Sequence, residues 1–171
     1  VGFPARGACH LLDLPQADTN GLDESFKILS GMMTTPNIVQ SAVDAERAVV
    51  LAEMREGTGP GTKVSDASHA LFFAGQPLAT RNPIGTPASL NAATASAMQA
   101  FHDRWYRPEN AVISVAGDID PAAIEVLIKK YFAPWKGVGP VVPSPDFGKP
   151  DPKFPSSTVV VQPGPPASIS L

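Results

Sequence analysis

Cysteine is nearly absent from this 171-residue sequence, which contains only Cys9. A single cysteine excludes both an internal disulfide and a zinc site built from several thiolates. Because no nucleophile motif surrounds Cys9, we expect it to act as a small buried apolar residue. Long apolar runs are missing too, since no stretch approaches the roughly 18 residues of a membrane span. No membrane-spanning helix is therefore predicted.

An excess of charge is also missing. The formal net charge is −3 at pH 7, and the acidic and basic residues are spread along the chain. Proteins that bind nucleic acid usually concentrate Lys and Arg on one face, so nucleic acid is not expected as a partner. The first residues lack the basic start and apolar centre of a signal peptide, and there is no initial methionine. The sequence therefore leaves the cellular location open, a periplasmic or organellar location included.

Periodic apolar residues predict several helices. The first follows the capping residues Asp18 to Asn20 and ends before Pro36, and a long one starts at Thr86 and Pro87. Three further helices are predicted at 38–56, 64–73 and from Asp120 to about 132. Short strands are predicted at "ACHLLDL", "AVISVAG", "STVVVQ" and "ASISL". Seven of the 22 residues at 134–155 are proline, which is typical of an extended connector.

Several potential functional motifs fail on inspection. The segment "GTGPGTK" lacks the order G-x-x-x-x-G-K-[ST] and follows a helix, so we interpret it as a turn. No two of the histidines are three to five residues apart, as a helical zinc pair requires; they are His10, His69 and His102. We expect them to be structural or surface groups. The helical spacing of Phe101, Trp105 and Tyr106 favours core packing over a ligand-binding site.

The stretch "ERAVVLAEMRE" carries two carboxylates, Glu46 and Glu53, on one predicted helix. Seven residues turn a helix to within roughly 20° of the starting direction and advance it by about 10 Å, so both acids share one face. Two interpretations follow from this spacing. The face is simply solvated, as most glutamates are, or one of the acids binds a metal ion.

The segment "ERAVVLAE" is followed about fifty residues later by "FHDRWYRPENAVISVAGDIDPAAIEVLIKKYFAPWKG". These two segments resemble the insulinase and pitrilysin family of zinc peptidases, which includes the mitochondrial processing peptidases. The segment "LLDLPQADTNGLDESFKILSGMM" and the turn "NPIGTP" fit the same layout. The similarity covers residues 11–137, in the order that the family has.

The resemblance implies a role for each acid. Family members bind zinc through two histidines of an H-x-x-E-H motif and through a glutamate on a later helix. Glu53 matches that later glutamate and is the expected third zinc ligand, whereas Glu46 is expected beside the metal, where it could orient a ligand imidazole. No H-x-x-E-H occurs in these 171 residues. The general base and the histidine ligands are therefore expected upstream of Val1, and no catalytic residue is assigned in this chain.

The family also implies an α+β fold with helices packed on one face of a mainly antiparallel sheet. We expect residues 1–133 to be the C-terminal portion of a peptidase domain, 134–155 the connector, and 156–171 the first strands of a following homologous unit. The expected function is that of a zinc metalloendopeptidase acting on peptides or unfolded polypeptides, with a second homologous half or subunit as partner. The alternative is a non-catalytic member that recognises substrate or supports an assembly.

Overall fold

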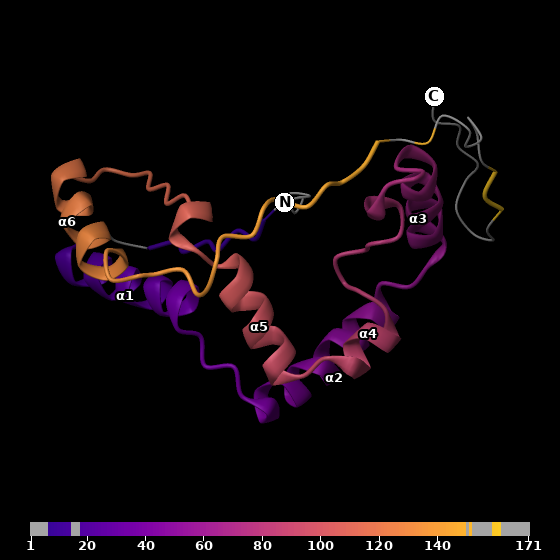
Figure 1. The fold of residues 1–171 in the computed structure, drawn as a ribbon, viewed down its shortest axis with the longest axis horizontal. Helices are drawn as coiled ribbons and strands as arrows, with labels where there is room; N and C mark the ends of the chain where they lie inside the picture. The colour runs from indigo at the N-terminus through magenta and orange to yellow at the C-terminus, as the bar shows by residue number, and fades with distance from the viewer. Residues whose placement is uncertain (1–6, 15–17, 150, 152–158, 162–171) are drawn as a thin grey trace. The chain divides into compact units, whose positions relative to one another are not determined.

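The protein is described from a computed structural model, which places residues 7–14, 18–149, 151 and 159–161. The chain forms two compact units. Unit 1 consists of Val1–Val39 and Thr94–Pro143, and unit 2 of Gln40–Ala93 and Ser144–Leu171. Figure 1 shows the order of the helices along the chain. None of the helices in the described ranges combines the length and the apolar character needed to cross a membrane.

Unit 1 is built from helices α1 (Thr19–Thr34), α5 (Ala95–Trp105) and α6 (Pro121–Phe132), with a short 3-10 helix, η2 (Pro108–Asn110). The predicted start of α1 is confirmed, because the Asp18 carboxylate accepts a hydrogen bond of 2.7 Å from the Gly21 amide. Asp120 caps α6 in the same way, and Pro121 occupies its first turn. Helices α1 and α6 pack side by side (Figure 1).

Polar contacts fix the pairing of α1 with α6. The Asp23 carboxylate accepts hydrogen bonds from Lys130 Nζ at 2.6 Å and from the Tyr131 hydroxyl at 2.9 Å. The Ser30 hydroxyl donates to the Tyr131 carbonyl at 3.0 Å. Phe26 on α1 and Ile124 on α6 are the buried apolar side chains of these two helices. The apolar stripes bring the helices together, and the polar contacts set their register.

Unit 2 contains helices α2 (Gln40–Glu56), α3 (Pro60–Phe72) and α4 (Pro87–Ala92), with the 3-10 helix η1 (Pro77–Ala79). The N-terminus of α4 is a capping box in which Thr86 and Ser89 exchange backbone and side-chain hydrogen bonds. The apolar stripe expected for this helix is Val39, Val43, Val50 and Met54. Val43 is buried and Val50 and Met54 are half-buried, whereas Val39 lies before the start of α2 and is 42% exposed. Arg55 lies in the last turn, where a cation suits the helix dipole.

The predicted long helix from Thr86 is wrong, because it is broken between α4 and α5. Ala93 takes an extended conformation, with φ of −66° and ψ of 130°, and Thr94 caps a new helix by accepting from the Ala97 amide at 3.2 Å. Threonine caps helices well because its hydroxyl satisfies an amide that lacks a helical carbonyl. The sequence "NAATASA" therefore contains a stop and a restart that its small residues conceal.

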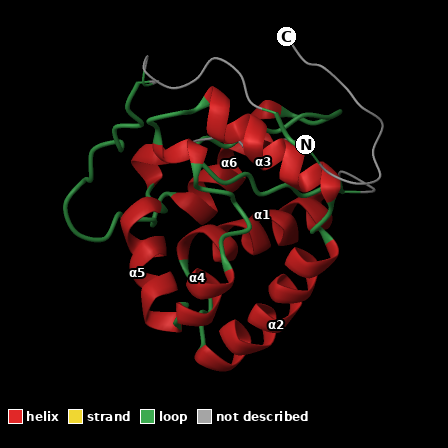
Figure 2. Ribbon diagram, turned by 90° about the vertical axis from the view of Figure 1, so that its right-hand side faces the viewer, coloured by secondary structure: helices red, strands yellow, loops and turns green. Residues whose placement is uncertain are grey.

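The predicted α+β fold is contradicted, since the described ranges contain helices and loops and no strand (Figure 2). The segment "AVISVAG" begins with Ala111 in an extended conformation but has no regular secondary structure in the placed part of the chain, and Val112 is 93% exposed. Alternating apolar residues favour an extended backbone, but a sheet also needs a partner for each row of amides and carbonyls. "ACHLLDL" likewise has no strand partner in the placed part of the chain, whereas "ASISL" and half of "STVVVQ" lie outside the described residues.

The start of the proline-rich connector is anchored to unit 1 by Arg107, which is only 4% exposed. Its guanidinium donates to the carbonyls of Val138 at 2.5 Å and Gly139 at 3.2 Å, and to Glu109 Oε1 at 2.6 Å. Gly137 lies directly against this guanidinium, so that an added Cβ would collide with it. A glycine is required here for close approach of the backbone to the arginine.

The free energy of unfolding at acidic pH should depend on the ionisation of Asp23. Hydrogen bonds from Lys130 and then Tyr131 lower the pKa of Asp23 below its usual 3.8. A depressed folded-state pKa contributes stability that is fully present above the unfolded value and is lost as pH falls through the folded value. Asp23→Asn should therefore be less stable near pH 7 and lose less additional stability below pH 4 than the parent. Urea unfolding at a series of pH values measures this, and parallel pH profiles for the two proteins would contradict it.

The close approach at Gly137 gives a second prediction. Gly137→Ala should destabilise the protein by about 1 to 3 kcal/mol, as expected for overpacking against a buried, hydrogen-bonded side chain. Gly61→Ala is the matched control, because no atom lies within 4 Å of a Cβ added to that helical glycine. The control should be neutral or stabilising by up to about 1 kcal/mol. Thermal unfolding compares the two, and equal effects would rule out the anchoring role of Arg107.

Candidate metal ligands on α2

Helix α2 presents Glu46 and Glu53 at the edge of its inner stripe. Measured from Val43 at about 100° per residue, the two acids lie roughly 60° and 80° to one side, while Val50 and Met54 lie within about 20° of it. Both glutamates are exposed. Neither side-chain carboxylate has a hydrogen bond or ion pair within the described part of the chain. The structure thus agrees with one shared face, and both carboxylates are accessible.

The accessible Glu53 carboxylate fits the chemistry of a zinc ligand, but it is one ligand and not a site. Zinc in a catalytic centre takes three protein ligands of the histidine, cysteine or carboxylate type. Within the residues that the structure places, no three such side chains are grouped closely enough to hold a metal ion. Glu53 can therefore supply one oxygen ligand, and Glu46 a second acid nearby, to a centre whose other ligands come from elsewhere.

Arg47 is the residue of this region that the sequence analysis missed. Its Nε donates to the Leu90 carbonyl at 2.9 Å and its Nη2 to the Ala93 carbonyl at 2.5 Å, both at the end of α4. Its Nη1 also pairs with Asp44 Oδ1 at 2.6 Å. One signal could have revealed it: Arg47 falls within the apolar stripe of α2, where a charged residue needs buried partners.

The histidines have structural surroundings, as expected. His102 is 8% exposed, its ring stacks on Tyr106, and its Nε2 lies 3.0 Å from the Met33 carbonyl, to which it donates. Its buried Nδ1 has no hydrogen-bond partner in the described residues. His10 lies 3.4 Å from the Tyr106 hydroxyl, and His69 packs edge-on against Phe73. None of these contacts makes a histidine pair for a metal.

Two expectations about packing are wrong. Cys9 is exposed and not buried. Phe101 is 59% exposed, whereas Trp105 and Tyr106 are half-buried. The buried residue of α5 is His102, one residue after Phe101. A hydrophobic pattern read across the break assigns the wrong face to α5.

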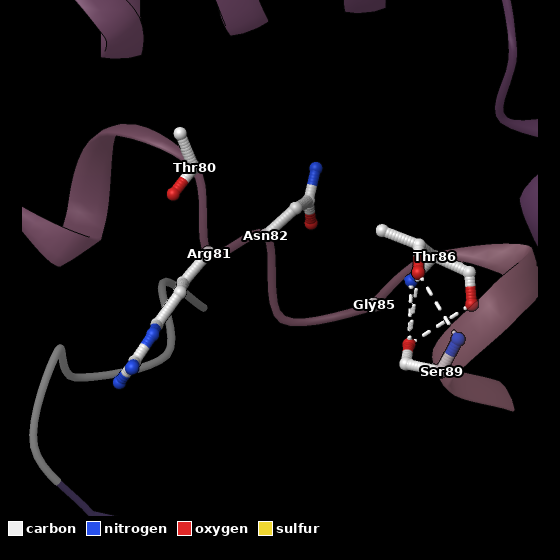
Figure 3. Close-up of a pocket in the computed structure, with 6 residues that line it drawn as sticks. All are labelled: Thr80, Arg81, Asn82, Gly85, Thr86 and Ser89. Carbon is white, nitrogen blue, oxygen red and sulfur yellow. Dashed lines mark hydrogen bonds between the residues drawn. The ribbon is translucent and has the colours of Figure 1, made fainter. Parts of the chain in front are cut away.

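A shallow hollow of about 340 Å³ surrounds the predicted "NPIGTP" turn (Figure 3). It is lined by Thr80, Arg81, Asn82, Gly85, Thr86 and Ser89. The Thr86 and Ser89 hydroxyls bond to each other and to the local backbone, as the dashed lines of Figure 3 show. Its lining contains neither an acid nor a histidine, so this hollow offers no metal ligand of the kind that zinc prefers.

Comparison with known proteins places these features in context. Residues 92–171 match the family model described as the peptidase M16 inactive domain. Over 121 residues the chain is 28% identical to a probable zinc protease, PqqL, of Haemophilus influenzae, covering 71% of this chain and 13% of that protein. The chain therefore spans about one eighth of the length of that relative.

Solved structures of proteases are similar to this chain as well. The ferredoxin protease FusC, crystallised as a mutant in complex with Arabidopsis ferredoxin, matches with a TM-score of 0.72 and 32% identity over 80% of this chain and 15% of FusC. The periplasmic protease PqqL of Escherichia coli matches with a TM-score of 0.72 and 26% identity over 79% of this chain. The match covers 15% of the whole PqqL and 29% of a structure of its first half.

Metal titration of this chain by itself tests the incomplete ligand set. With one or two carboxylates and no histidine pair, it should bind zinc far more weakly than the three-ligand centres of zinc enzymes. Isothermal titration calorimetry should show no saturable site below about 10 µM, and zinc at that concentration should raise the melting temperature by less than about 1 °C. A stoichiometric, tight zinc site in this chain would contradict the assignment of Glu53 as one ligand of a set completed elsewhere.

Proposed function

Because the chain belongs to the insulinase and pitrilysin family of zinc peptidases, we propose that the protein containing it is a zinc metalloendopeptidase that hydrolyses peptides or unfolded polypeptides. The observation that carries the proposal is the pair Glu46 and Glu53 on one accessible face of α2, in the order that the family's E-R-x-V-V-L-x-E pattern has. The relatives named as probable zinc proteases support the same activity.

In this proposal Glu53 is the third protein ligand of the metal. Zinc, when bound, would polarise the scissile carbonyl and activate a water molecule. The Glu53 carboxylate would contribute an oxygen ligand and part of the negative charge that balances the dication. Glu46, two helical turns earlier, would accept a hydrogen bond from a ligand imidazole and so fix its orientation. The general base and the two histidines are assigned to an H-x-x-E-H motif upstream of Val1.

The proposed division of the chain into domains also follows from its similarity to the peptidase family. Residues 1–133 would form the C-terminal portion of a peptidase domain, and 134–155 would lead to a homologous unit that begins within 156–171. The proline content of 134–155 supports a connector at this place. A second homologous half or subunit would then close the substrate site. The crystallised first half of PqqL supports a division of this kind in a relative.

A second candidate function is that of a non-catalytic partner subunit. One observation favours it: the family model that matches residues 92–171 describes an inactive domain. Such a protein would recognise substrate or support an assembly without a metal. It would have no H-x-x-E-H upstream of Val1 and no zinc after purification, which separates it from the peptidase.

Substitution of the proposed ligand in the full-length protein tests the peptidase. Glu53→Gln should reduce bound zinc from about one equivalent to near zero after dialysis, because a neutral amide is a poor zinc ligand, and peptide cleavage should fall with it. Glu46→Gln should weaken zinc binding by about 10 to 100-fold, as loss of a ligand-orienting group does. Metal analysis and cleavage of a quenched fluorescent peptide measure both effects.

The matched control is Glu56→Gln, which removes an exposed carboxylate from the end of the same helix. It should retain the zinc content and activity of the parent protein. If Glu53→Gln also retains both, Glu53 is not a ligand and the proposed function fails for this site. Absence of zinc from the parent protein would instead favour the non-catalytic subunit.

A further inference from the structure

Helix α2 is weakly fixed by its apolar stripe. Val43 is its one buried residue in the structure, while Val50, Leu51 and Met54 are half-buried. Apolar contacts are not directional, so a stripe of this size sets the side of the helix that faces inward but tolerates rotation about the axis. A carboxylate at the edge of the stripe, such as Glu53, would move with any such rotation.

The directional contact of α2 is made by Arg47, whose side chain is 20% exposed. The guanidinium binds the Leu90 and Ala93 carbonyls with two different nitrogens, at 2.9 and 2.5 Å. Its third nitrogen is held at 2.6 Å by Asp44, one turn earlier on the same helix. A planar guanidinium with all three nitrogens engaged has a defined orientation, so that it joins α2 to α4 at one angle.

The two carbonyls are available because of the break between α4 and α5. In a continuous helix the Ala93 carbonyl would accept from the Ala97 amide, which here donates to the Thr94 hydroxyl instead. The Leu90 carbonyl accepts from the Ala93 amide at 3.2 Å, which leaves its second lone pair for Arg47. Arg47 therefore satisfies backbone oxygens that the break exposes, and the break in turn gives Arg47 its partners.

Because Arg47, Glu46 and Glu53 lie on one helix, the contact that fixes Arg47 also fixes the direction of both acids. At about 100° per residue, Glu46 and Glu53 lie roughly 100° and 120° from Arg47, in the same direction around the axis. A rotation of about 20° would move a side-chain tip some 5 to 6 Å from the axis by about 2 Å. Metal–ligand distances must be met within about 0.2 Å, so even a smaller rotation would impair coordination.

We propose that Arg47 is a positioning residue: by binding the carbonyls at the end of α4, it fixes the rotation of α2 and directs the Glu46 and Glu53 carboxylates toward the metal. This inference rests on the proposed function, because Glu53 must be a zinc ligand for its direction to matter. It assigns a role to the arginine of "ERAVVLAE", which lies between the two acids and contacts neither of them in the described structure.

The test uses the full-length protein with Arg47→Met, which keeps the length of the apolar stem and removes all three hydrogen bonds. Zinc affinity measured by competition with a chelator should fall by about 10 to 100-fold, as for other groups that orient a ligand. The absorption bands of the cobalt-substituted protein should shift, because the coordination geometry changes. Arg55→Met is the matched control, an exposed arginine on the same helix, and should leave affinity within about twofold and the cobalt bands unchanged.

Two further variants separate positioning from general stability. Val43→Ala should lower the melting temperature of the metal-free protein by creating a cavity under α2, while it leaves the Arg47 contacts in place. Its zinc affinity should fall less than that of Arg47→Met at an equal loss of melting temperature. Arg47→Lys retains the charge without the planar fork and should be intermediate, which keeps the test valid if Arg47→Met does not fold.

The outcomes distinguish the two proposals. If the parent protein binds zinc through Glu53, but Arg47→Met and Arg47→Lys retain parental affinity and cobalt bands, the positioning role is overturned and the proposed function stands. If Val43→Ala and Arg47→Met weaken zinc binding equally at matched stability, Arg47 is merely structural and the inference is again overturned. If Glu53→Gln binds zinc as the parent does, the proposed function fails first and this inference fails with it.

Discussion

The hydrogen bonds from Arg47 to the Leu90 and Ala93 carbonyls are the interaction on which the candidate site depends. They join the helix that carries the two glutamates to the end of α4. There the Ala93 carbonyl has lost its helical donor, and the Leu90 carbonyl, which also accepts from the Ala93 amide, has a second lone pair for Arg47. A part-buried carbonyl without a donor is costly, so Arg47 stabilises the break by donating to Ala93. In the proposed role of Arg47, the carbonyls at the end of α4 thus fix the rotation of α2 and with it the direction of Glu53.

In unit 1 another arginine donates hydrogen bonds to backbone carbonyls. The Arg107 guanidinium donates to backbone carbonyls of Val138 and Gly139, which fixes the start of the connector where regular structure has ended. Asp23 joins α1 to α6 in a similar way, because its carboxylate accepts hydrogen bonds from Lys130 Nζ and from the Tyr131 hydroxyl. Few side chains are buried in the described residues. The polar contacts of Arg47, Arg107 and Asp23 therefore fix the relative orientation of the segments that they join, which non-directional apolar packing does not determine.

The sequence predicts local features well and tertiary ones poorly. Caps at Asp18, Thr86 and Asp120 identify three helix starts, because a capping side chain and its amide are neighbours in the chain. The spacing of Glu46 and Glu53 is local too, so their common face is predicted. The burial of His102 is not predicted because its partner Met33 is distant in the chain, and the break at Ala93 is not predicted because the small residues around Thr94 suit a continuous helix equally well. The predicted sheet fails for the same reason: alternation in "AVISVAG" favours an extended chain but cannot supply the neighbour that a strand requires.

Coordination of zinc by the Glu53 carboxylate in the full-length protein is the proposal on which the roles of Glu46 and Arg47 rest. The decisive measurement is a crystal structure of the zinc-loaded protein with anomalous data at the zinc edge. A Glu53 oxygen is expected at about 2.0 to 2.2 Å from the metal, with Arg47 still bound to the carbonyls at the end of α4. A zinc ion coordinated entirely by other groups, with Glu53 turned to solvent, would contradict it.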